Sequence, residues 1–258
     1  MRNNRVLDTW RNGGQTIGGW LSIDSSFGAE AMAHVGFDWL CIDLQHGAAE
    51  TASVLPMLQG ISNTDTVPFV RVPWNDPATI MRVLDAGAYG VIVPLVNNRE
   101  EAERAVWATR YPPVGGRSSG PYRAPMYAGA DYQREANDKI ALVVMIETAE
   151  ALENLDDILA VDGIDAAYIG PSDLAYGIGL TPTGDNNDPR HVETVETIYN
   201  ACKKHNVAPG IHTASAEFTK RWLDHGFQMV MLGIDVAFMR NAATDQLTDV
   251  RNHASSEG

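Results

Sequence analysis

Cysteine and lysine are scarce in this chain of 258 residues, and basic residues are outnumbered by acidic ones. Its two cysteines, Cys41 and Cys202, exclude a disulfide framework and a four-cysteine zinc site, and favour a reducing, cytoplasmic location. The 19 Lys and Arg stand against 33 Asp and Glu, and the net charge of −14 argues against nucleic acid or an anionic membrane as a partner. No apolar run approaches the roughly 20 residues of a membrane-spanning helix, and no signal peptide is predicted.

What the chain does contain is an alternation of short apolar runs with longer amphipathic stretches. Eight runs rich in Val, Ile and aromatic residues are predicted to be strands: Thr16–Ile23, Phe37–Asp43, Val67–Val72, Gly90–Val96, Ile140–Glu147, Ala166–Gly170, Ala208–His212 and Gln228–Gly233. The stretches between them are typical of helices and include Ser26–Val35, Pro77–Ala86, Arg99–Arg110, Ala149–Leu159 and His191–His205.

Eight strand–helix units in about 250 residues predict a single TIM (β/α)8 barrel, an α/β fold. A doubly wound open sheet is the main alternative, and the count of eight argues against it. Since no linker-like segment interrupts the pattern, residues 1–258 are predicted to form one domain.

The segment Tyr111–Asp138 is rich in Gly, Pro, Ser, Arg and Tyr, and it is predicted to be a long loop. Loops of this length in a compact domain are usually functional or mobile. Arg117 and Arg123 are therefore candidates for drawing an anionic substrate toward an acidic protein, with a surface or interface role as the alternative.

Polar residues gather where the predicted strands end, which is where a TIM barrel carries its chemistry. His46 lies three residues after Asp43, a spacing that suits a dyad in which the carboxylate orients the ring and raises its basicity. A purely structural histidine is equally consistent with this spacing. Arg71 follows the third strand and His212 the seventh.

Two further carboxylates, Glu147 and Asp173, come at the ends of the fifth and sixth strands. A carboxylate directly after the apolar run 141–146 is costly unless it meets a cation. Two carboxylates from neighbouring strands suit a hard divalent ion such as Mg²⁺ or Mn²⁺. The alternative is that Glu147 pairs with an arginine while Asp173 caps a helix.

The four lysines, at positions 139, 203, 204 and 220, are predicted to lie away from the carboxyl ends of the strands. Lys139 precedes the fifth strand, and the other three are on helices. None of them can form a Schiff base with a carbonyl substrate at the mouth of the barrel. Lysine-based aldolase chemistry is therefore disfavoured, and metal-based enolate chemistry remains.

Five blocks of the sequence resemble the HpcH/HpaI-type class II pyruvate aldolase family, in the order found there. Residues 37–47 (FDWLCIDLQHG) resemble its FDWLxIDxEH signature, and the later blocks are residues 70–73 (VRVP), 84–88 (LDAGA), 146–148 (IET) and 169–174 (IGPSDL). The resemblance covers residues 18–233. Residues 44–47 and 210–213 are most similar to the hydroxyketoacid (hydroxypyruvate) aldolase branch.

The resemblance implies a carbon–carbon lyase that catalyses reversible aldol addition to, or retro-aldol cleavage of, 4-hydroxy-2-oxo acids. Pyruvate or hydroxypyruvate would be the donor, held as an enolate on a divalent metal ion (Mg²⁺, Mn²⁺ or Co²⁺), and an aldehyde the acceptor. The family also implies a homohexamer, a trimer of dimers in which the last helix is exchanged between partners.

The residue roles implied by the resemblance fall on strand ends and on one helix end. Glu147 and Asp173 would hold the metal, Arg71 would stabilise the enolate, and His46, backed by Asp43, would act as the base through a water on the metal. The remaining implied residues are a supporting acid at Asp85 and substrate-binding groups at Gly170, Ser172 and Asp173, where the backbone N–H groups of Ser172 and Asp173 would carry the pyruvate carboxylate. His212 is added to the substrate-binding residues because its place after the seventh strand puts it at the aldehyde end of the pocket.

Two departures from the family pattern lie near the pocket. Met145 stands where many relatives have Gln, and His212 where many have an aliphatic residue, so the aldehyde specificity of those relatives is not carried over. Two alternatives to the aldolase remain. One is a lyase of the same superfamily acting on a β-hydroxyacyl-CoA, and the other is a non-catalytic barrel that binds a keto acid or a metal.

Overall fold

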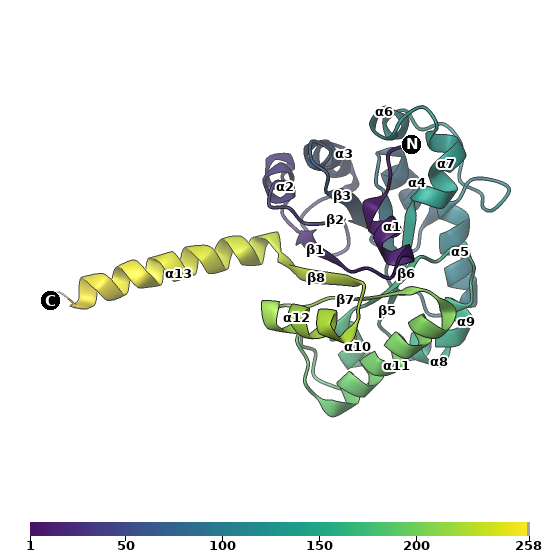
Figure 1. The fold of residues 1–258 in the computed structure, drawn as a ribbon. Helices are drawn as coiled ribbons and strands as arrows, with labels where there is room; N and C mark the ends of the chain where they lie inside the picture. Colours follow the sequence, from purple (N-terminus) through teal and green to yellow (C-terminus); the bar gives the residue numbers. More distant parts are fainter. Residues whose placement is uncertain (257–258) are drawn as a thin grey trace.

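A closed barrel of eight parallel strands forms the centre of the computed structural model, which describes residues 1–256 (Figure 1). The last two residues of the predicted 1–258 domain lie outside the described part. The strands follow chain order around the barrel: β1 (Thr16–Leu21), β2 (Trp39–Asp43), β3 (Val67–Arg71), β4 (Gly90–Val93), β5 (Ala141–Ile146), β6 (Ala166–Ile169), β7 (Ala208–Ile211) and β8 (Met229–Ile234). The predicted single TIM barrel is confirmed, and all eight apolar runs contain a strand.

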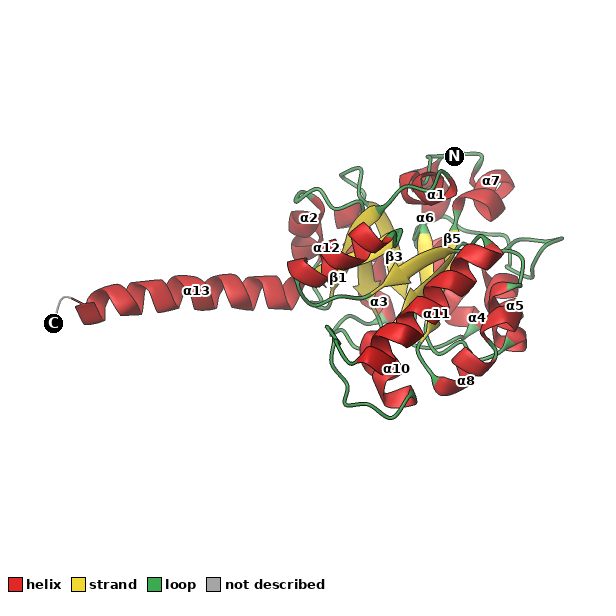
Figure 2. Cartoon of the chain, turned by 60° about the horizontal axis from the view of Figure 1, so that its bottom comes forward, coloured by secondary structure: helices red, strands yellow, loops and turns green. Residues whose placement is uncertain are grey.

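Helices accompany the strands, and most of them cover the outside of the barrel (Figure 2). They are α1 (Arg5–Arg11), α2 (Ser26–Ala33), α3 (Thr51–Ile61), α4 (Pro77–Asp85), α5 (Arg99–Thr109), α6 (Arg123–Ala128), α7 (Tyr132–Lys139), α8 (Ala149–Glu153), α9 (Leu155–Leu159), α10 (Pro171–Gly177), α11 (Pro189–His205), α12 (Ala216–His225) and α13 (Asp235–Ser256). Side-chain caps define several helix starts, because Ser25, Asp76 and Asp188 each accept a hydrogen bond from the first turn that follows. The predicted helix Ala149–Leu159 is divided into α8 and α9 at Asn154.

Aromatic side chains fill the interior of the barrel. Trp20 of β1 stacks on Tyr168 of β6 at 5.7 Å between ring centroids, and strands that are not neighbours can meet only across the interior. Trp39 contacts Trp20 at 6.3 Å and Phe69 at 5.8 Å, and Phe69 contacts Trp10 of α1. These rings form a continuous column from α1 at the amino ends of the strands to Trp20 at the carboxyl ends.

Glycine makes room for this column on the neighbouring strands. A Cβ on Gly18 would overlap the ring of Trp39, and one on Gly90 would overlap the ring of Phe69. Each pair sits side by side in the register of adjacent strands. The packing of the column therefore depends on glycine at both positions.

The predicted loop Tyr111–Asp138 is wrong in part, because α6 and most of α7 lie within it. Both helices are short, and the segment before them contains the Gly and Pro that suggested a loop. Arg123 donates hydrogen bonds to the carbonyl of Ala86 at the end of α4 and to Ser62 Oγ at the end of α3. The segment thus packs against helix ends rather than over the mouth of the barrel.

The last helix, α13, extends away from the barrel as a separate arm (Figures 1 and 2). Val236, Met239, Leu247 and Val250 are 43–65% exposed on it. Together with Ala243 they recur every three or four residues and so share one face of the helix. Across residues 1–256, no helix combines the length and apolar character that crossing a membrane requires.

Candidate active site

A cavity of about 290 Å³ opens at the carboxyl ends of the strands. Its lining comes from seven of the eight strands or from the loops that follow them: Trp20, Ser22, Asp43, His46, Arg71, Met145, Glu147, Gly170, Pro171, Ser172, Asp173, His212 and Ile234. The catalytic, substrate-binding and metal-binding residues expected above are all present except Asp85, and the two candidate steering arginines, Arg117 and Arg123, are also absent from the lining. The strand ends therefore bring distant parts of the chain into one cavity.

Arg71 and Asp43 form a two-point ion pair in this cavity. Arg71 Nε donates to Asp43 Oδ1 at 2.8 Å, and Arg71 Nη2 donates to Oδ2 at 2.7 Å. Burial disfavours both charges, but their mutual hydrogen bonds and attraction outweigh it, so the pKa of Asp43 is lowered and that of Arg71 is raised. The guanidinium lies 5.0 Å from the Trp20 ring, and within residues 1–256 its Nη1 makes no hydrogen bond. Arg71 is therefore a fixed cation with one free donor nitrogen.

The predicted contact between the His46 ring and the Asp43 carboxylate is absent. Asp43 Oδ1 instead accepts the backbone N–H of Gln45 at 3.0 Å and of His46 at 3.4 Å, in addition to Arg71 Nε. The His46 imidazole is exposed at the cavity and has no hydrogen-bond partner among the described residues. Asp43 thus positions the loop that carries His46, and it holds Arg71 rather than the ring.

Glu147 and Asp173 provide a pair of carboxylates on the other side of the cavity. Glu147 is 2% exposed, and its Oε1 accepts the Leu95 backbone N–H at 2.9 Å. A Cβ on Gly170 would overlap Oε2, so the glycine leaves space beside this oxygen. Among the described residues no group of three or more His, Cys, Asp and Glu side chains can hold a metal. A hard cation that takes one or two carboxylates and completes its shell with water and substrate fits this donor set.

Burial raises the pKa of Glu147 to about 7, with a further contribution from the charge of Asp173, while the Leu95 N–H and Arg71 oppose the shift. Between the ordinary value of 4.5 and about 7, the folded metal-free chain therefore binds more protons at this site than the unfolded chain. The contribution of Glu147 to the free energy of unfolding is therefore fully present below this pH range and is lost as the pH rises through it.

We expect the melting temperature of metal-free protein to fall relative to that of Glu147→Gln as the pH is raised from 5 to 8. Calorimetry of both proteins in chelator would measure the difference, because the other titrating groups are common to the two. Added Mg²⁺ should reverse the slope for the wild type alone, since the ion binds the ionised carboxylate. A constant difference across this pH range would contradict the assignment.

Leu95 was not suggested by the sequence, because it acts through its backbone. Its φ of 54° lies in the left-handed region, which is unfavourable for a side chain with a Cβ. This conformation accompanies the hydrogen bond from the Leu95 N–H to Glu147. No feature of the sequence marks a leucine for that role.

His212 directly follows β7, the neighbour of β6, and its backbone N–H donates to the Ile169 carbonyl at the end of that strand. Its Nδ1 shares a hydrogen bond of 3.2 Å with the hydroxyl of Tyr168, and its ring meets Trp20 edge-on at 5.2 Å. Burial and then the charge of Arg71 lower the pKa of His212 to about 3. The ring is therefore neutral at physiological pH. Trp20 and Tyr168, both missed in the sequence, lie in apolar strands whose inward-facing positions cannot be assigned from composition alone.

Asp85, Arg117 and Arg123 are not brought to this cavity. Asp85 is the last residue of α4, and helices that follow strands in a barrel end beside the strands' amino ends. Its Oδ1 accepts a hydrogen bond from Arg117 Nη2 at 2.8 Å, and the Arg117 side chain is fully buried. Arg117 and Arg123 therefore lie away from the mouth of the barrel within their own chain.

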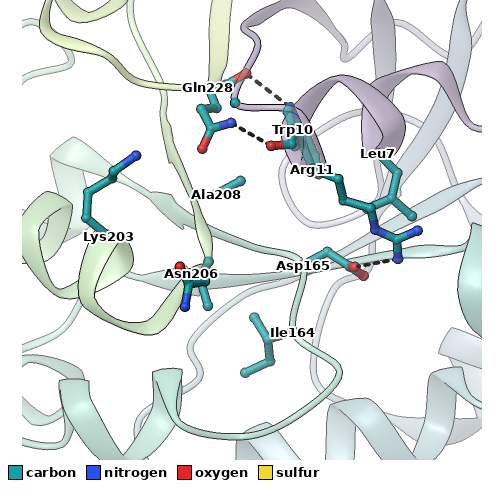
Figure 3. Close-up of a pocket in the computed structure, with 11 residues that line it drawn as sticks. Leu7, Trp10, Arg11, Ile164, Asp165, Lys203, Asn206, Ala208 and Gln228 are labelled. Atoms are coloured by element: carbon teal, nitrogen blue, oxygen red, sulfur yellow. Dashed lines mark hydrogen bonds and ion pairs between the residues drawn. The ribbon is translucent and has the colours of Figure 1, made fainter.

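A second cavity lies at the amino ends of the strands, beside α1 (Figure 3). Its one carboxylate, Asp165, pairs with Arg110 at 2.9 Å and with Arg11 at 3.6 Å. Gln228 Nε2 donates to the carbonyl of Trp10 at 2.9 Å. These contacts join α1 to the barrel, so the groups here serve the fold.

Comparisons with known proteins find relatives that match nearly the whole length of this chain. The family model described as HpcH/HpaI aldolase/citrate lyase matches residues 16–242. A hydroxypyruvate/pyruvate aldolase of Rhizorhabdus wittichii is 39% identical over 248 residues, which is 96% of this chain and 99% of that protein. A 4-hydroxy-2-oxo-heptane-1,7-dioate aldolase of Klebsiella pneumoniae is 41% identical over 247 residues, 93% of this chain and 91% of the relative. The crystal structure of an HpcH/HpaI aldolase/citrate lyase family protein from Burkholderia cenocepacia has a TM-score of 0.90 at 32% identity and covers 96% of this chain and 100% of that one.

Proposed function

The chain belongs to the HpcH/HpaI aldolase/citrate lyase family and is an aldolase, a carbon–carbon lyase, and we propose that it interconverts 4-hydroxy-2-oxo acids with a 2-oxo acid donor and an aldehyde. Pyruvate and hydroxypyruvate are the proposed donors, as in the name of the Rhizorhabdus relative. One observation carries the proposal: a single cavity joins the fixed Arg71 cation to the carboxylates of Glu147 and Asp173.

Glu147 and Asp173 are the proposed ligands of a divalent ion, for which Mg²⁺, Mn²⁺ and Co²⁺ are the candidates. When bound, such an ion polarises the keto group of the donor and eases loss of a proton from the adjacent carbon. The carboxylate–glycine arrangement around Glu147 Oε2 supports this assignment, because it leaves one oxygen of a buried carboxylate without a protein partner. The four lysines play no part in the proposed reaction.

Other residues of the cavity are proposed to bind the donor, stabilise the enolate and transfer the proton. The backbone N–H groups of Ser172 and Asp173 have no acceptor among the described residues and are proposed to hold the donor carboxylate. Arg71 Nη1 would donate to the enolate oxygen, and the Asp43 carboxylate keeps the guanidinium in place for that task. His46, with an unpaired imidazole at the cavity, would take the C3 proton directly or through water and return it to the aldehyde oxygen.

A retro-aldol assay tests this function. Metal-loaded protein is incubated with a racemic 4-hydroxy-2-oxo acid, and pyruvate is measured with lactate dehydrogenase and NADH. Pyruvate should appear in the presence of the divalent ion and not in chelator. A protein that binds the 2-oxo acid but releases no pyruvate from any such substrate would be a binding barrel, and the proposal would be wrong.

We also propose that the chain assembles as a homohexamer, a trimer of dimers, with α13 packed on a neighbouring copy. The exposed stripe of Val236, Met239, Ala243, Leu247 and Val250 supports a helix–helix or helix–barrel contact. Within one chain Asp85 lies at the far end of the barrel, so its predicted supporting role requires presentation by a second copy.

Leu247→Glu should lower the molar mass in solution, because it places a charge on the stripe, whereas Asn241→Glu places the same charge on a different face and should not. Multi-angle light scattering at micromolar concentration would measure both. A wild-type protein that is monomeric under these conditions would contradict the assembly.

A further inference from the structure

In the proposed reaction the 2-oxo acid donor occupies only one half of the cavity. Arg71, Glu147 and the 170–173 segment come from β3, β5 and β6. Four further lining groups, Ser22, His46, His212 and Ile234, come from the contiguous strands β7, β8, β1 and β2 or the loops after them. This second half is where the acceptor aldehyde must lie.

Ser22 is a rigidly held residue with a free hydroxyl in this half. Its backbone N–H donates to Asp235 Oδ1 at 2.9 Å, and its carbonyl accepts the N–H of Ala48 at 2.8 Å. The adjacent Ile23 N–H donates to Asp235 Oδ2, and Asp235 is itself buried at the start of α13. Both backbone groups of Ser22 are thus satisfied. Its Oγ has no hydrogen-bond partner among the described residues, although the residue lines the cavity and is only half-buried.

The charges around this half disfavour an anionic acceptor. Arg71 is the one Lys or Arg among the lining residues, and two of its nitrogens are bonded to Asp43. The carboxylate of Asp235 lies directly behind Ser22 and has no cationic partner in residues 1–256. A carboxylate on the acceptor would therefore lose water without gaining a cation and would approach a buried negative charge.

We propose that Ser22 is a specificity-determining residue that selects uncharged aldehydes carrying a hydroxyl next to the carbonyl. The Ser22 hydroxyl would hydrogen-bond the 2-hydroxyl of the acceptor, while the neighbouring His46 addresses the carbonyl oxygen. The assignment rests on the proposed aldolase function. It also separates this chain from relatives named for a 1,7-dioate, whose cleavage leaves a second carboxylate on the aldehyde fragment.

The test compares acceptors that differ in one group. With pyruvate and Mg²⁺ or Mn²⁺, kcat/KM for aldol addition is measured with glycolaldehyde, with its deoxy analogue acetaldehyde, and with succinic semialdehyde. The proteins are wild type, Ser22→Ala, Ser22→Thr and the matched control Ser26→Ala, which removes an exposed hydroxyl on the same segment outside the cavity. Because the readout is a ratio of two substrates on one protein, a partly unfolded variant does not alter it.

Wild type should prefer glycolaldehyde to acetaldehyde and disfavour the semialdehyde by at least about 10-fold. Ser22→Ala should lower the glycolaldehyde-to-acetaldehyde ratio by about 2- to 12-fold, the size of one neutral hydrogen bond. Ser22→Thr retains the hydroxyl and should keep most of the preference, and Ser26→Ala should keep all of it. An unchanged ratio in Ser22→Ala, or a wild-type preference for the semialdehyde, would overturn the assignment.

Exchange of the pyruvate methyl protons in deuterated water separates the two levels of the argument, since it needs no acceptor. If wild-type protein exchanges these protons while the Ser22 ratios stay flat, the specificity assignment fails and the aldolase stands. If wild-type protein with metal catalyses neither exchange nor addition, the proposed function fails and the Ser22 assignment falls with it.

Discussion

Glu147→Gln is expected to reduce aldol cleavage by about 10³-fold or more, one of the largest effects of any single change in the cavity. The substitution keeps the size of the side chain and leaves an amide oxygen to accept the Leu95 N–H, so the fold should survive. It removes the charge of one of only two proposed protein ligands. The bound ion contributes several kcal/mol of transition-state stabilisation in reactions of this type, and losing it costs at least three powers of ten.

Metal titration followed by isothermal calorimetry, alongside the pyruvate-release assay, would measure this loss. Chelator-treated wild type should be equally inactive and should recover when Mg²⁺, Mn²⁺ or Co²⁺ is restored, whereas the variant should not recover at the same concentrations. Borohydride added with pyruvate should leave no covalent adduct on any of the four lysines. Full activity in demonstrably metal-free protein, or a trapped lysine adduct, would show that the proposed chemistry is wrong.

Proton exchange into pyruvate should fall by about 10²–10⁴-fold in His46→Ala, which is the usual loss when a general base is removed. In Arg71→Lys the exchange should fall by about 10²-fold or more, because lysine cannot bond both Asp43 oxygens and still present a donor to the enolate. Mass spectrometry of pyruvate incubated in deuterated water isolates enolate formation from carbon–carbon bond cleavage. Calorimetric metal affinity should be nearly unchanged in both variants, since neither residue is a proposed ligand.

Asp43→Asn distinguishes the observed contact from the dyad expected from the sequence. Since the carboxylate holds Arg71 and the loop backbone rather than the His46 ring, the variant should slow exchange without moving the acid limb of its pH profile. A shift of that limb by a full pH unit would show that Asp43 acts on the imidazole after all. Wild-type exchange rates in His46→Ala, or normal cleavage in Arg71→Lys, would refute the roles given to those residues.

The barrel was predictable because most of its strands are buried on both faces, so that their sequences are nearly continuous apolar runs. The run at 140–147 and its neighbour at 90–96 are of this kind, and the strands at 141–146 and 90–93 occupy them. The short helices α6 and α7 were not predictable, because their packing depends on contacts such as that of Arg123 with the ends of α3 and α4. Tertiary contacts of this kind produce no helical periodicity of apolar residues in the sequence.

The site was predictable in position and less so in its contacts. Strand ends marked His46, Arg71 and Glu147 correctly as residues of one cavity. The partner of Asp43 could not be derived, because both the imidazole and the guanidinium are compatible with its place on the barrel, and only the distances decide. Leu95 could not be found either, since a backbone N–H carries no residue-specific signal.

The glycines beside the aromatic column constrain how this sequence can drift over evolutionary time. An alanine at Gly18 would collide with Trp39, and an alanine at Gly90 would collide with Phe69, so neither substitution is accessible while its neighbour stays large. Loss of either ring alone would leave a void in the barrel, which is also costly. A substitution at one member of each pair is therefore tolerated only together with a substitution at the other. In descendants of this chain the glycine and the aromatic residue of each pair should covary: where the glycine has been replaced, a smaller side chain should stand in place of the aromatic one.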